Sequence, residues 1–163
     1  SQTYQKGSWI LHMLRGVVGT ENFWKGIQIY YKKYQKFNAT TNDFKKIMEE
    51  VSGKNLTIFF QQWLYKPGAL ELSGNWKYDH KEQQVLITLN QVQTDGSLFE
   101  MPIELGINFK GEQHQQIELV QVKEKSTVFK IKTETEPENI ILDPNSWVLM
   151  RADFKKTAPS SPL

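Results

Sequence analysis

Hydrophobic side chains in the first 68 residues recur at the spacing of an α-helix. The first run places five of them on one helical face, namely Trp9, Ile10, Met13, Leu14 and Val17. Gly19 ends this run, and Thr20 is expected to cap a second helix whose apolar residues are Phe23, Ile27, Tyr30, Tyr31 and Tyr34. The pattern therefore predicts two consecutive amphipathic helices.

Two further helices are predicted before residue 68. Thr40 and Asp43 have the spacing of a capping box at the start of the third helix, and Gly53 stands where a left-handed cap would end it. Asn55 is expected to cap the fourth helix, whose apolar face is Leu56, Phe59, Phe60, Trp63 and Leu64. Pro67-Gly68 then stops the helix.

After residue 68 the period of the hydrophobic pattern changes to two. The clearest alternating run is Ile103, Leu105, Ile107 and Phe109, each separated from the next by one residue. Asp95-Gly96 and Lys110-Gly111 lie between such runs and suit tight turns. Several short strands at this spacing predict an antiparallel β-sandwich.

The predicted fold class is therefore α+β, with about four N-terminal helices followed by an antiparallel β-sandwich. We expect residues 1–68 to form the helical segment, residues 69–156 the sandwich, and residues 157–163 a flexible tail.

Composition narrows the function classes. The formal charge is only +2, and the lysines are mixed with acidic residues, which indicates a solvated surface rather than a basic stripe that binds nucleic acid. The chain has no cysteine, so disulfides and thiolate metal sites are excluded. No apolar run approaches the roughly 20 residues that span a bilayer. We therefore expect no nucleic-acid partner and no membrane segment.

A catalytic zinc site is not expected within these 163 residues. Such a site needs about three protein ligands, commonly two histidines one helical turn apart and a carboxylate. The only histidines are His12, His80 and His114, and no pair of them has this spacing. We also find no serine in a nucleophile elbow and no glycine-rich phosphate loop. Trp24, Tyr30, Tyr31 and Tyr34 are interpreted as core packing rather than a binding surface.

One segment carries a more specific signal. Tyr4-Gln5-Lys6-Gly7 resembles the Tyr-x-Lys-Gly segment of M1-family (gluzincin) zinc aminopeptidases. The resemblance continues in the order of the family through further segments, which are Gly19 to Phe23, Gly26, Tyr30, Thr41 to Phe44, Met48-Glu49, Phe59 to Trp63 and Pro67-Gly68. It covers most of the helical half, whereas the sandwich is similar to the family's β-domain mainly by position and size.

The resemblance implies a chemistry. Enzymes of this family bind zinc through a His-Glu-x-x-His helix and a later glutamate, and they remove N-terminal residues from peptides. Tyr4 matches the family's tyrosine, whose neutral phenol donates a hydrogen bond to the oxyanion of the tetrahedral intermediate. The chain is then expected to be the C-terminal fragment of such an enzyme. Its partners would be peptide substrates and the remainder of the catalytic domain, and the fragment alone would be inactive because the zinc ligands lie upstream.

Two other functions remain open at this point. A chain that keeps the M1 fold and loses the zinc would serve as a protein-interaction scaffold, because fold does not fix function. Alternatively, the sandwich would be an independent peptide or carbohydrate module, for which Trp76, Tyr78 and Trp147 are the candidate contact residues. An upstream His-Glu-x-x-His helix distinguishes the enzyme from the scaffold.

Overall fold

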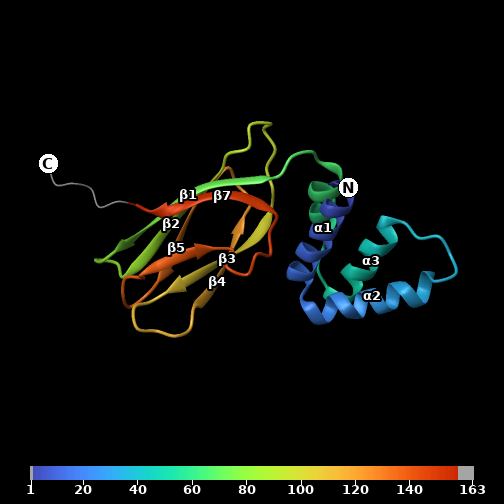
Figure 1. Cartoon of the computed structure of the whole chain (residues 1–163), viewed down its shortest axis with the longest axis horizontal. Coiled ribbons are helices and arrows are strands. Elements are labelled where there is room, and N and C mark those ends of the chain that lie inside the picture. Colours follow the sequence, from blue (N-terminus) through green and yellow to red (C-terminus); the bar gives the residue numbers. More distant parts are fainter. Residues whose placement is uncertain (1, 158–163) are drawn as a thin grey trace. The chain divides into compact units, whose positions relative to one another are not determined.

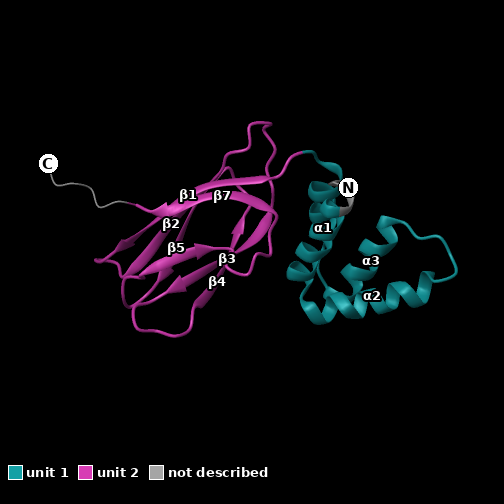
Figure 2. Cartoon of the chain, viewed as in Figure 1, with its two compact units in different colours: residues 1–67 teal, residues 68–163 magenta. Residues whose placement is uncertain are grey.

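The computed structural model describes the backbone of residues 2–157 and the side chains of residues 5–157. The chain divides into two compact units, one ending at Pro67 and the other beginning at Gly68 (Figure 2). Among residues 2–157, the regular elements of the first unit are helices and those of the second unit are strands, so the predicted α+β class of helices followed by a β-sandwich is confirmed.

The helical unit begins with α1 (Gln2–Val18), followed by α2 (Thr20–Tyr34) and α3 (Thr41–Ser52). Figure 1 shows α2 and α3 side by side. They approach closely at Gly26, where an added Cβ would lie 2.7 Å from the sulfur of Met48. The core of this unit is built from buried side chains of every helix, among them Met13, Leu14, Ile47, Met48, Leu56 and Trp63.

The ends of α3 follow the local sequence signals, whereas the starts of α2 and of the fourth helix depart from them. The capping box is present, because the Asp43 amide donates to Thr40 Oγ1 at 3.2 Å and the Thr40 amide donates to Asp43 Oδ2 at 2.9 Å. Gly53 has φ 68° and ends α3 in the left-handed conformation. Asn55, which we expected to cap the fourth helix, lies one residue before the cap position, which Leu56 occupies, although Asn55 Oδ1 accepts the Thr57 amide proton at 2.9 Å. The cap of α2 was predicted wrongly: Gly19, with φ 88°, precedes the helix, and Thr20 is its first residue.

The fourth helix is not a continuous α-helix. A single α-helical turn, α4 (Thr57–Phe60), leads into a π-helical segment, η1 (Gln61–Tyr65). The Lys66 amide donates to the Gln61 carbonyl across five residues at 3.2 Å. The wider turn rotates the following side chains, so Trp63 is 1% exposed whereas Leu64, predicted on the same apolar face, is 37% exposed.

The second unit is a sandwich of two sheets (Figure 1). The first sheet has the order β5-β2-β1-β7, from β5 (Ser126–Lys132), β2 (Gln84–Gln91), β1 (Leu70–Asp79) and β7 (Met150–Lys156). The second has the order β4-β3-β6, from β4 (Gln116–Val122), β3 (Met101–Asn108) and β6 (Asn139–Leu142). All pairs are antiparallel except β1 with β7, because the last strand runs beside β1 in the same direction.

Alternation along the strands places one row of side chains in the sandwich core. Leu72, Trp76, Ile87, Ile103 and Leu105 are all at most 2% exposed. Beyond β7, the amide of Thr157 donates to the carbonyl of Trp76 at 2.8 Å. The remainder of the predicted tail, residues 158–163, lies outside the described residues.

Two assignments of aromatic residues to the core were wrong. Trp24 is 52% exposed and Tyr31 is 67% exposed on α2. The helical period identifies which residues share a face, but α2 packs through Phe23, Gly26, Ile27 and Tyr30, and the face carrying Trp24 and Tyr31 is left uncovered in this unit.

Candidate active-site helix

Tyr4, the predicted catalytic residue, lies in the first turns of α1. Its side chain lies outside the described residues. The geometry that bears on its role is therefore that of the helix that carries it and of the surface next to it.

Helix α1 is held from Ile10 to Val18 by contacts within the helical unit. Ile10, Met13, Leu14 and Val18 are at most 5% exposed, so one face is fully packed. At the C-terminal end, Lys54 Nζ donates to the carbonyl oxygen of Val17 at 2.5 Å. A cation at the carbonyl end of a helix is electrostatically favourable. The helix that carries Tyr4 is thus fixed to the end of α3 as well as to the core.

An apolar hollow lies against the side of α1 that carries Gly7 and Leu11. Tyr4, Gly7, Leu11 and Leu14 follow a spacing of three, four and three residues, which places them along one side of the helix. A cavity of about 380 Å³ is lined by Gly7, Leu11 and Leu14 of α1 together with side chains from α2, α3, α4 and η1. This hollow could not be predicted from the sequence, because the residues that line it are as far apart in the chain as Gly7 and Leu64.

The three histidines lie in separate places. His12 is on α1, where its ring contacts that of Trp9 edge to face with centroids 5.6 Å apart. His80 follows β1, and its Nε2 lies 3.4 Å from the Glu136 carboxylate. His114 lies in the loop before β4. Among residues 5–157, no three histidine, aspartate or glutamate side chains gather as metal ligands would. The described residues therefore do not fit a catalytic zinc.

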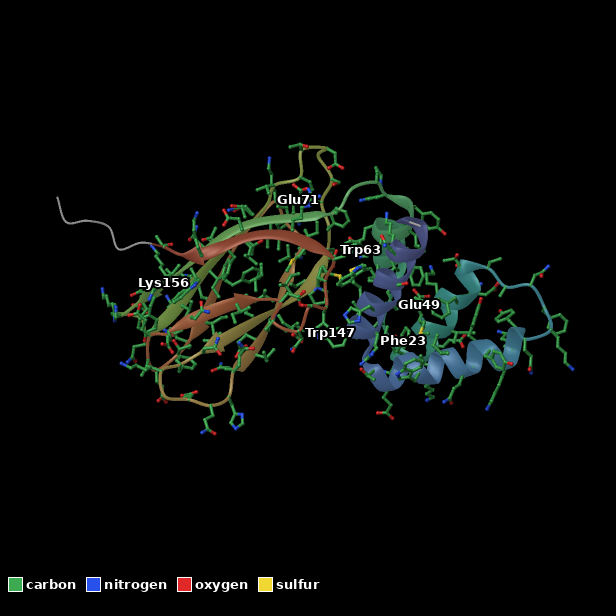
Figure 3. The ribbon with its side chains drawn as sticks, in the orientation of Figure 1. Phe23, Glu49, Trp63, Glu71, Trp147 and Lys156 are labelled. Atoms are coloured by element: carbon green, nitrogen blue, oxygen red, sulfur yellow. The ribbon has the colours of Figure 1, made fainter. Side chains whose placement is uncertain are left out.

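The carboxylates with shifted pKa values take part in contacts that stabilise the fold. The pKa of Asp43 is lowered because its carboxylate accepts hydrogen bonds from the Thr40 hydroxyl and amide. The pKa of Glu136 is lowered chiefly by a hydrogen bond from Lys156, whose Nζ lies 2.9 Å away. Lys156 Nζ also lies 4.7 Å from the ring centroid of Trp76, over the ring face; Lys156 is labelled in Figure 3. Trp76 itself is 1% exposed, so it is a core residue and not the contact residue of a binding module.

The helical unit is similar to a known protein family. Residues 1–63 match the family described as "Peptidase family M1 domain". Among curated proteins, aminopeptidase N of Lactococcus lactis subsp. lactis is 33% identical over 108 residues, covering 64% of this chain and 12% of the relative. Leucyl aminopeptidase of Saccharolobus solfataricus is 31% identical over 110 residues, covering 66% of this chain and 14% of the relative.

A solved structure has the same fold over both units. The aminopeptidase A of Legionella pneumophila, in complex with aspartic acid, superposes with a TM-score of 0.74 at 21% identity. The match covers 91% of this chain and 18% of that protein. The chain thus spans about an eighth of the length of its curated relatives. The match of residues 1–63 to the peptidase family M1 model agrees with the resemblance that starts at the Tyr4 segment. In the part of the chain that the structure describes, no helix is long and apolar enough to cross a bilayer.

Proposed function

We propose that this chain is part of a zinc-dependent aminopeptidase of family M1, in which Tyr4 stabilises the transition state of peptide-bond hydrolysis. The observation that carries the proposal is the family match, which begins at the Tyr4 helix and continues through residue 63. In this proposal residues 1–68 form the helical end of the catalytic domain and residues 69–156 form a β-domain that follows it.

The proposed role of Tyr4 follows from the properties of a phenol. A tyrosine hydroxyl has a reference pKa of about 10, so it stays protonated and donates a hydrogen bond at neutral pH. Attack on a peptide carbonyl develops negative charge on its oxygen, and a donor placed there stabilises the transition state more than the substrate. Loss of one such donor typically costs about 2.7–4 kcal/mol of barrier.

In this proposal the zinc is held by residues outside this chain, which is consistent with residues 5–157 containing no group of three metal-binding side chains. The partners that follow are the remainder of the catalytic domain and peptide substrates. The names of the three relatives cited, which are aminopeptidases, support hydrolysis at the N-terminal end of a peptide as the reaction of the longer protein.

The experiment that tests this assignment uses the 163-residue chain and an aminoacyl reporter substrate. We expect no turnover by the purified chain, with or without added zinc, because Tyr4 lacks the rest of the reaction centre. Zinc-dependent turnover by the chain alone would contradict the proposal. A longer protein that contains this chain but no upstream His-Glu-x-x-His helix would support the alternative role of a non-catalytic scaffold.

A further inference from the structure

Gly7 occupies an unusual place for a glycine. It lies inside α1, where glycine is less favourable than alanine, and its backbone does not need a positive φ. A Cβ added at Gly7 would meet no atom of the described chain within 4 Å. Nothing in this structure therefore requires a glycine there, in contrast to Gly26, whose added Cβ would contact Met48 at 2.7 Å.

The space in front of Gly7 is the apolar hollow of about 380 Å³. The described residues that line it include no charged side chain. Leu11 and Leu64 at its border are 43% and 37% exposed, although both are large aliphatic residues. An uncharged hollow with exposed leucines fits an apolar occupant, because a charged or strongly polar group would lose its hydration there without a compensating ion pair.

The occupant is constrained by the proposed role of Tyr4, on which this inference rests. Tyr4 shares a face of α1 with Gly7 and Leu11, and it can act only if a second body of protein brings the rest of the reaction centre to that face. The relatives provide such a body, since the matched segment is 12% of the Lactococcus lactis protein.

We propose that the hollow beside Gly7 is the docking seat for apolar side chains of the remainder of the M1 catalytic domain, and that Gly7 permits close approach of that segment. The seat would then align α1, and Tyr4 with it, against the rest of the reaction centre. Because glycine has no side chain, the covering segment of the catalytic domain can come close to the backbone of α1 at Gly7.

The test compares one substitution in two settings. The first is the 163-residue chain, and the second is a chimera in which this chain replaces the aligned stretch of the Lactococcus lactis aminopeptidase N. Gly7→Leu adds a side chain to the hollow, and Gln28→Leu on the exposed side of α2 is the matched control. In the isolated chain we expect both variants to leave Tm unchanged or raised, because leucine is a good helix former.

In the chimera, Gly7→Leu should lower Tm by about 5 °C or more, whereas Gln28→Leu should not lower it. A second pair, Leu11→Asn against Ile29→Asn, covers the case in which Gly7→Leu does not fold. Leu11 and Ile29 are 43% and 38% exposed, but only Leu11 lines the hollow, so only Leu11→Asn should cost more in the chimera than in the isolated chain.

Three results would overturn the proposal. The first is an equal effect of each variant in both settings, and the second is a chimera that does not fold with the wild-type residues. The third is a rise in the KM of the Gly7→Leu chimera without a change in its Tm, which would assign the hollow to the peptide substrate. Tm separates this inference from the proposed function: a chimera that is inactive but shows the expected Tm pattern would support the docking seat and count against the proposed function.

Discussion

Lys54 Nζ donates a hydrogen bond of 2.5 Å to the backbone carbonyl of Val17, 37 residues earlier in the chain. The bond joins the residue after the cap of α3 to the last turn of α1, where the carbonyl groups lack helical partners. The orientation of the helix that carries Tyr4 is therefore coupled to the end of α3.

Replacing Lys54 by methionine should destabilise the helical unit by about 0.5–1 kcal/mol, a value kept small because the lysine is exposed to solvent. Methionine retains most of the side-chain length and removes the charged donor. Urea denaturation followed by tryptophan fluorescence measures the change, and Lys36→Met in the loop after α2 is the control. Equal losses in the two variants would show that the bond to Val17 does not contribute.

The capping box of α3 should make stability depend on acid pH. The folded pKa of Asp43 is lowered by its hydrogen bonds from Thr40, so the unfolded state binds the proton more tightly. The resulting stabilisation is complete above the ordinary aspartate pKa of about 3.9 and is lost as the pH falls through the lowered folded pKa.

Unfolding measured from pH 6 to pH 2 tests this dependence. The stability difference between the wild type and Asp43→Asn should be largest at pH 6 and should shrink toward pH 2. Thr40→Val should reduce the same dependence, because it removes the hydroxyl that donates to the carboxylate at 2.7 Å. Asp95 and Glu136 also have lowered pKa values, but they titrate equally in all three proteins. A constant difference across the range would be inconsistent with the assignment.

Gln91 joins three segments of the sandwich with one buried amide. It is 3% exposed, its Nε2 donates to the carbonyls of Phe99 at 2.8 Å and Glu124 at 3.2 Å, and its Oε1 accepts the Phe99 amide proton at 2.8 Å. Gln91→Leu should cost about 3 kcal/mol, because buried backbone groups would lose their partners. Gln121→Leu on the exposed side of β4 should stay within about 0.5 kcal/mol. Thermal unfolding compares the two variants, and a similarly small loss of stability in both would contradict the proposed role of the Gln91 amide.

The sequence predicts the local features of this fold well, because the signals for them are local. The capping box at Thr40 and Asp43 and the left-handed cap at Gly53 each depend on residues within one helical turn. The change from period 3.6 to period two near residue 68 separates helices from strands for the same reason.

Features set by tertiary packing were not predictable. The π-helical turn at Gln61 rotates Leu64 away from the core, and nothing in the spacing of apolar residues distinguishes it from a regular helix. Trp24 and Tyr31 have the pattern of a core face, but they are 52% and 67% exposed, and no described segment of the helical unit covers them. Tyr4 was singled out through the family resemblance, because an isolated tyrosine carries no positional signal of its own.

The account depends on Tyr4 acting as a hydrogen-bond donor in the longer enzyme. The most direct measurement is kcat and KM for an aminoacyl reporter in the longer protein that contains this chain, with Tyr4→Phe compared against Tyr31→Phe, a tyrosine exposed on α2. We predict that Tyr4→Phe lowers kcat by about 10²–10³-fold with a smaller change in KM, and that Tyr31→Phe changes neither. A Tyr4→Phe enzyme with the kcat of the wild type would contradict the central claim.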